Sequence, residues 1–115
     1  MITNDKDTRV QLVENLRGGN KTAKLNHLVE SDKLKSKAKL FVKITLEKDA
    51  SIGLHEHSED FEIYYILKGT GIVSESDGNK TVVAGDVIYT ADGQTHAIKN
   101  IEDEDLEFLA VVINE

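Results

Sequence analysis

Residues 49–69 read DASIGLHEHSEDFEIYYILKG, and this stretch decides the fold. Two runs with a period of two, residues 50–57 and 61–67, flank the polar residues Ser58, Glu59 and Asp60. Because side chains in a strand alternate between two faces, this pattern indicates two half-buried strands joined by a turn. The second run is rich in Ile and Tyr, which strands favour. We therefore expect a hairpin of neighbouring strands here.

The rest of the chain repeats this periodicity. Further strands are predicted over residues 22–30, 40–46, 71–76, 80–84, 85–90, 96–100 and 106–114, and an acidic turn over residues 101–105. Asp77-Gly78-Asn79 lies between two of these runs, and its Asp-Gly step favours a hairpin turn in which both residues have positive φ. Many short strands separated by glycine turns predict an all-β sandwich or barrel.

Residues 8–16 allow two interpretations. Thr8 and Gln11 could form a capping box, and Gly18 could end the resulting helix. The same residues could instead form a short edge strand. The sequence leaves this choice open.

Composition limits the class of protein. The chain has 115 residues, 39% hydrophobic and 30% charged, which predicts one globular domain over residues 1–115. It has no cysteine, so disulfides and thiolate metal sites are excluded. The formal charge of −7 and the scattered basic residues argue against a nucleic-acid partner. The first residues are polar and do not resemble a secretory signal. The longest apolar run, residues 108–113, is too short to span a membrane. We therefore expect a cytoplasmic protein.

The histidines suggest a metal site. His55 and His57 are two residues apart, so both imidazoles project from one face of their strand. Glu62 opens the next strand and could reach the same ion, while His96 would have to come from a distant segment. Three imidazoles and a carboxylate suit a divalent Mn, Fe, Ni, Co or Zn ion. On spacing alone, a surface strand with polar faces explains the His-x-His pair equally well.

The spacing of these residues resembles the two sequence motifs of the cupin superfamily. The first motif has a glycine, His-x-His, Glu and Gly at set intervals, positions taken here by Asp49, His55, His57, Glu62 and Gly69. The second has Gly, Pro-x-Gly, His and Asn, positions taken here by Gly85, Ala91, Gly93, His96 and Asn100. Asp49 and Ala91 depart from the family pattern. Both are turn positions, and Asp tolerates positive φ better than most residues.

The resemblance covers residues 49–100 and implies a jelly-roll barrel of two antiparallel sheets, preceded by an N-terminal extension over residues 1–20. It implies that one divalent ion is held by His55, His57, Glu62 and His96. It also implies turn roles for Gly69 and Gly85 and a turn or structural role for Asn100. Small cupins are often homodimers, for which the outward side chains Phe61, Ile63, Tyr65 and Leu67 could supply a contact.

Several other residues have competing interpretations. His27 lies on an apolar strand face, where a packed histidine is favoured over a contact to the site or its ligand. Tyr64 and Tyr89 are expected near the site, as core tyrosines or as polar groups of the pocket. Arg17 is expected in an exposed loop, or, if that loop folds over the barrel mouth, paired with a carboxylate substrate. Glu102 to Asp105 are expected in a solvated turn.

Two functions from different classes fit the resemblance. One is a metal-dependent enzyme, such as a dioxygenase, decarboxylase or isomerase, acting on a small organic acid or sugar derivative. The other is a cupin that binds a small ligand through the metal without turnover. A third possibility, a barrel with no ligand, fits the complete ligand set least. A fold alone does not choose between the first two, because the pocket lining decides.

Overall fold

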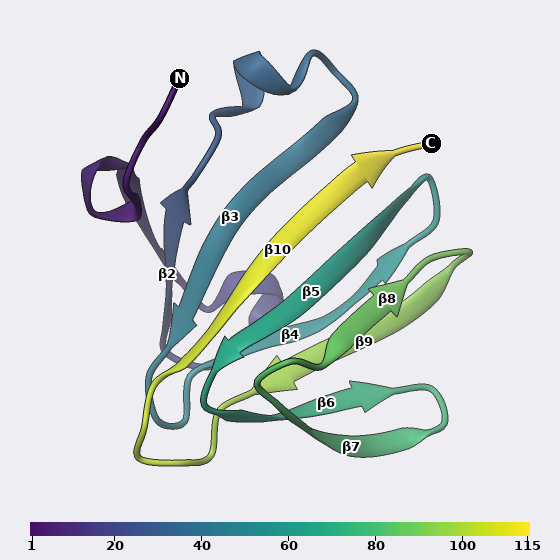
Figure 1. Ribbon diagram of the computed structural model, residues 1–115. Coiled ribbons are helices and arrows are strands. Elements are labelled where there is room, and N and C mark those ends of the chain that lie inside the picture. Colours follow the sequence, from purple (N-terminus) through teal and green to yellow (C-terminus); the bar gives the residue numbers. More distant parts are fainter.

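The computed structural model describes all residues, 1–115, and consists of two antiparallel sheets that face each other (Figure 1). The six-stranded sheet has the order β1 (Arg9–Glu14), β2 (Thr22–His27), β3 (Ala38–Leu46), β10 (Leu106–Asn114), β5 (Asp60–Lys68), β8 (Val87–Thr90). The four-stranded sheet has the order β4 (Ser51–His57), β9 (Gln94–Lys99), β6 (Thr70–Glu75), β7 (Gly78–Val83). Three short 3-10 helices, η1 (Asp5–Asp7), η2 (Leu16–Gly18) and η3 (Ser31–Leu34), lie in the connections. The predicted all-β architecture is confirmed, although hydrogen bonds do not close the two sheets into one barrel.

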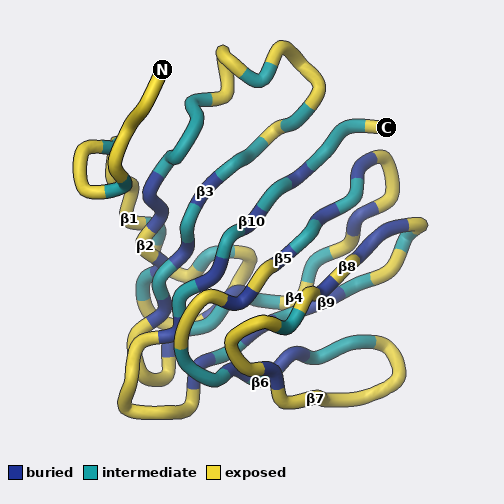
Figure 2. Tube along the Cα trace, viewed as in Figure 1, coloured by how far each residue is buried: buried dark blue, intermediate teal, exposed yellow.

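The core lies between the sheets and follows the alternation of the strands. On β10, Leu106, Phe108, Ala110 and Val112 are buried, whereas the residues between them are half-exposed. This strand pairs with β3 on one side and β5 on the other, so its inward side chains occupy the middle of the larger sheet. Figure 2 shows buried positions concentrated along these strands, while β1 and β7 are mostly exposed. Each large apolar side chain buried here contributes about 1.5–3 kcal/mol to folding.

The expected hairpin of residues 50–67 is wrong in one respect. The residues form two strands, β4 and β5, but β4 pairs with β9 and β5 pairs with β10 and β8. The short turn after His57 therefore carries the chain from one sheet to the other. The start of β5 therefore lies in the six-stranded sheet, opposite the end of β4 in the four-stranded sheet.

The ambiguous segment 8–16 is an edge strand. Residues 9–14 form β1, which pairs antiparallel with β2 along its whole length. Asn15 then turns the chain with a left-handed φ of 53°. Pairing with β2 supplies the backbone hydrogen bonds that a helix would otherwise have formed within itself.

The hairpin between β6 and β7 turns one residue earlier than its sequence predicted. Glu75 pairs with Gly78, so Ser76 and Asp77 occupy the centre of the turn. Only Gly78 of the Asp-Gly step has a positive φ, 122°. The prediction that both residues would do so is wrong.

The turn residues of the two motifs behave as the resemblance implied. Asp49 has a φ of 68°, Gly69 of 86° and Gly85 of 97°. The Asn100 side chain is fully buried, donates to the Leu46 and Glu104 carbonyls at 2.9 Å each, and accepts from the Glu102 amide. Asn100 thereby ties together the segments that close one end of the core.

Where Ala91 replaces the family's proline, its amide N–H donates to Gln94 Oε1 at 3.3 Å. A proline has no N–H and could not make this bond. The left-handed residues Asp92 and Gly93 follow directly and complete the turn.

The outer face of β5 carries exposed apolar side chains. Tyr65 and Leu67 are exposed, and the neighbouring strand β8 adds Val87 and Tyr89. Phe61 and Ile63 are half-buried on the same face. A homodimer contact over this face stays a prediction. No helix of the structure has the length and apolar character needed to cross a membrane.

Candidate metal centre

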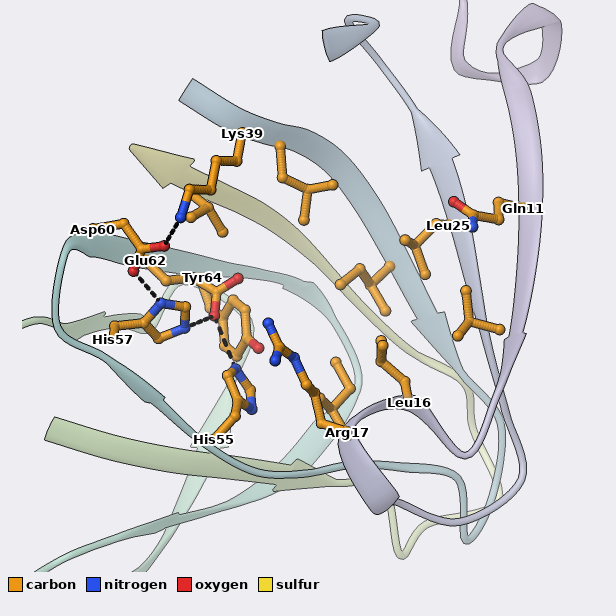
Figure 3. A pocket seen from close by; sticks show the side chains of 15 residues that line it. Gln11, Leu16, Arg17, Leu25, Lys39, His55, His57, Asp60, Glu62 and Tyr64 are labelled. Atoms are coloured by element: carbon orange, nitrogen blue, oxygen red, sulfur yellow. Dashed lines mark hydrogen bonds and ion pairs between the residues drawn. The ribbon is translucent and has the colours of Figure 1, made fainter. Parts of the chain in front are cut away.

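Four side chains from three strands converge between the sheets. His55 and His57 project inward from β4, and His96 lies opposite His55 on the neighbouring strand β9. Glu62 approaches from β5 in the other sheet (Figure 3 shows the two β4 histidines and Glu62). One potential ligand atom from each of the four residues lies within 4.8 Å of all the others. The structure thus brings together the whole predicted set.

The remaining nitrogen of each imidazole has its own partner. Nδ1 of His55 lies 2.8 Å from the Gly53 carbonyl oxygen, Nδ1 of His57 lies 2.6 Å from Asp60 Oδ1, and Nδ1 of His96 lies 2.8 Å from Thr90 Oγ1. Such contacts orient a ring and fix which nitrogen carries the hydrogen. All three Nε2 atoms therefore point into the same space.

These contacts create a concentration of hydrogen-bond acceptors. A carbonyl or carboxylate oxygen can only accept, so Nδ1 donates in His55 and His57, and Nε2 of each neutral ring is a bare acceptor. Nε2 of His57 nevertheless lies 2.9 Å from Glu62 Oε1, and Nε2 of His55 lies 2.9 Å from Nε2 of His96. The contact between His57 and Glu62 joins two acceptors, which repel each other unless a cation or a proton lies between them. A divalent ion satisfies all four groups at once.

The electrostatics favour the ionised carboxylate and a neutral His96. Burial opposes ionisation of Glu62, but the adjacent His55 and His96 imidazoles outweigh it and lower the pKa of Glu62 to about 2. Burial also lowers the pKa of His96 below its usual value of 6.5, against the opposing effect of Glu62. Near neutral pH both groups are in the form that binds a metal.

A cavity of about 370 Å³ opens onto this cluster. Its wall is largely apolar, with Ile44, Ile52, Leu40 and Leu25 among the lining residues. Ligand sites are commonly of this kind, mostly apolar with a few polar groups at defined points. The polar lining groups include His55, His57, Glu62, Tyr64, Arg17, Gln11 and the pair Lys39–Asp60. The cavity is therefore large enough for a small molecule in contact with a bound ion.

Tyr64 forms part of the cavity wall next to the cluster. It is 2% exposed, and its ring stacks on His96 with centroids 4.9 Å apart. Burial and the negative Glu62 raise the pKa of Tyr64 well above its usual value, so its hydroxyl stays protonated. Tyr89, by contrast, is exposed and packs against Phe61 on the outer face, so the expectation that it lies near the site is wrong.

The other candidate residues lie outside the cluster, although Arg17 lines the adjoining cavity. His27 is half-buried, and its Nε2 lies 2.8 Å from Gln11 Oε1 on the neighbouring strand. The acidic residues 102–105 form an exposed turn, as predicted. Arg17 lines the cavity, which agrees with the alternative interpretation in which its loop folds over the mouth.

Sequence reasoning missed the residues that orient the ligands. The sequence pattern places Asp60 only in a turn, yet it contacts both His57 and Lys39. Its position three residues after His57, directly before the next strand, is a signal that could have found it. Thr90 and the Gly53 carbonyl have no such signal, because their roles depend on strand pairing.

Comparisons of the sequence and the structure with known proteins point to the same family. Residues 42–112 match the model of the cupin domain. An oxalate-binding protein of Thermotoga maritima is 38% identical over 113 residues, covering 98% of this chain and 93% of that protein. The crystal structure of a predicted oxalate decarboxylase from the same organism has a TM-score of 0.95 and 37% identity, and the match covers 100% of both chains.

A cupin-superfamily sugar phosphate isomerase from Silicibacter pomeroyi has a TM-score of 0.80 with 20% identity, over 100% of this chain and 76% of that one, which shows the fold alone. The domain match and the Thermotoga relative both extend over most of the chain and include the converging histidines and glutamate. This chain belongs to the cupin family.

Proposed function

We propose that this protein binds one divalent metal ion through His55, His57, Glu62 and His96, and binds a small carboxylate such as oxalate at that ion. The observation that carries the proposal is the convergence of three imidazoles and the ionised Glu62 carboxylate on one point at a cavity. The similarity to the oxalate-binding protein of Thermotoga maritima supports the choice of oxalate as the first ligand to test.

The chemistry of the four residues fits Mn, Fe, Ni, Co or Zn. When bound, the ion supplies a Lewis acid that attracts the oxygens of a carboxylate. The protein's part is to orient the three imidazoles toward one point, and to leave the cavity side of the cluster open. The apolar lining around that opening keeps water away from the bound ligand and strengthens its attraction to the ion.

The cavity lining favours binding over turnover. A catalyst that moves protons needs a group poised to exchange one near neutral pH. Tyr64 stays protonated because its pKa is raised, and Asp60 is already engaged by His57 and by Lys39 at 2.8 Å. We therefore place ligand binding first and a metal-dependent enzyme, such as a decarboxylase, second.

Isothermal titration calorimetry with oxalate tests the proposal. The protein is stripped of metal with a chelator and studied both metal-free and after loading with one equivalent of Mn²⁺. We expect one oxalate per chain to bind to the loaded protein and none to the metal-free protein. Equal binding to both forms, or to neither, would refute the proposal. Release of carbon dioxide and formate from oxalate by the loaded protein would establish the enzyme instead.

A further inference from the structure

Arg17 is a cation without a partner in the protein. The chain has two arginines, and the other, Arg9, forms a two-pronged pair with Glu30 at 2.9 Å for each bond. No side-chain hydrogen bond or ion pair engages the Arg17 guanidinium, although Arg17 lines the cavity. Figure 3 shows this guanidinium extending into the cavity on the side of Tyr64 and His55.

The loop that carries Arg17 is built to hold it there. We call residues 15–21 the arginine loop. Asn15, Arg17 and Lys21 all have left-handed φ values, of 53°, 55° and 57°. Each such residue costs about 1–3 kcal/mol and persists only where surrounding contacts enforce it. The loop is thus held in a conformation that its residues do not prefer.

Contacts with β4 supply that enforcement. A Cβ on Gly53 would collide with the Arg17 carbonyl, and a Cβ on Gly19 would collide with the Ser51 carbonyl, so the two backbones touch directly. The Asn20 amide donates to Ser51 Oγ at 2.8 Å, and the Ser51 amide donates to the Asn20 carbonyl at 3.0 Å.

Gly53 links this loop to the metal centre. Its carbonyl accepts from Nδ1 of His55, while its Cα packs against the Arg17 backbone. The position of the arginine is therefore fixed relative to a predicted metal ligand. Leu16 adds an apolar anchor, since it packs against the core.

We infer that Arg17 binds the second carboxylate of a ligand whose first carboxylate is held by the metal, and so selects a short dianion over a monoanion. This inference rests on the proposed function. A guanidinium offers two parallel N–H donors that match a carboxylate.

The charges around the cavity support this selection. Two cationic side chains line the cavity, Lys39 and Arg17, and Lys39 is already paired with Asp60. The Glu62 carboxylate would be bound to the ion and would not neutralise Arg17. Arg17 is therefore the one lining cation free for a ligand. The chain as a whole carries a formal charge of −7, which repels a dianion at long range. Recognition of a dianion therefore requires a local positive group at the cavity, in addition to the ion.

The test compares oxalate with oxamate, in which an amide replaces one carboxylate. Affinities of both are measured by calorimetry on Mn²⁺-loaded wild type, Arg17→Gln and Arg17→Lys, with Arg9→Gln as a matched control away from the cavity. Mn²⁺ affinity is measured for each variant without either ligand. We expect Arg17→Gln to bind oxalate about ten- to a hundredfold more weakly, with Mn²⁺ affinity and oxamate affinity changed much less.

Two further outcomes are expected, namely partial retention of oxalate affinity in Arg17→Lys and wild-type behaviour in Arg9→Gln. Unchanged oxalate binding in Arg17→Gln would overturn the inference while leaving the proposed function intact. Equal losses for oxalate and oxamate, or a comparable loss of Mn²⁺, would overturn it as well. Failure of the wild type itself to bind oxalate when loaded would instead count against the proposed function.

Discussion

Replacing Asp60 by Ala should weaken metal binding although Asp60 does not belong to the predicted ligand set. Its carboxylate lies 2.6 Å from Nδ1 of His57 and is largely buried. Burial opposes its ionisation, but the hydrogen bonds from Lys39 and His57 lower its pKa, so it carries a negative charge at neutral pH. A charged partner makes the imidazole a stronger ligand and holds the ring in place.

The size of the effect follows from this contact. A hydrogen bond to a charged group contributes about 1.5–3 kcal/mol, which corresponds to roughly ten- to a hundredfold in affinity. Loss of an orienting partner of a metal ligand has an effect of the same size, about ten- to a hundredfold. We expect Asp60→Ala near the upper end. Asp60→Asn should lie near the lower end, since its amide oxygen can still accept from His57.

Competition with a chromogenic chelator measures these affinities, with Lys39→Met as the control. That variant removes the ion pair of 2.8 Å but leaves the contact between Asp60 and His57. Because the Lys39 side chain is 56% exposed, we expect a change of less than about fivefold. Wild-type affinity in Asp60→Ala would refute the reasoning, and so would an equal loss in Lys39→Met.

Three further predictions concern stability. Acidification from pH 7 to 5 should lower the melting temperature of the metal-free protein, because burial lowers the pKa of His96 and the unfolded chain therefore takes up this proton more readily. The melting temperature should fall again between pH 4.5 and 2, because the lowered pKa of Glu62 means that the unfolded chain is protonated first. A melting temperature that rises in either range would contradict these assignments. Gly53→Ala should lower the free energy of thermal unfolding by about 1–3 kcal/mol, since the added Cβ meets the backbone of the arginine loop. It should also weaken oxalate binding to the metal-loaded protein. Unchanged stability would show that the loop is not held as described. Asn100→Ala should lower the free energy of unfolding in urea by about 2–4 kcal/mol, because the buried Leu46 carbonyl and the part-buried Glu104 carbonyl lose their donor. The exposed Asn79→Ala should change it by less than about 0.5 kcal/mol.

Local patterns in the sequence were sufficient to predict the strands, whereas the full ligand set followed from the resemblance to the cupin motifs. The alternation around His55 and His57 placed both imidazoles on one face, and the motif spacing added Glu62 and His96. The positive φ expected at Asp49 is present because the turn before β4 requires it. The strand alternation and the Asp49 turn depend on neighbouring residues, which a sequence displays directly.

Features that depend on pairing between distant strands were not predictable in this way. The sequence predicts a hairpin where the chain crosses from β4 to β5, because a sequence does not say which sheet a strand joins. The contact of Thr90 with His96 depends on two segments that meet only in the fold. Arg17 was expected in an exposed loop or over the mouth, and only the packing of Gly53 against its backbone decides between these positions.

Titration of Zn²⁺ into the metal-free protein, followed by calorimetry, tests most directly whether His55, His57, Glu62 and His96 share one ion. Wild type and His27→Ala should each bind one ion with similar affinity. His96→Ala should lose more than about a hundredfold, since loss of an orienting partner alone costs up to that much. Undiminished binding in His96→Ala, or no binding by the wild type, would contradict the account.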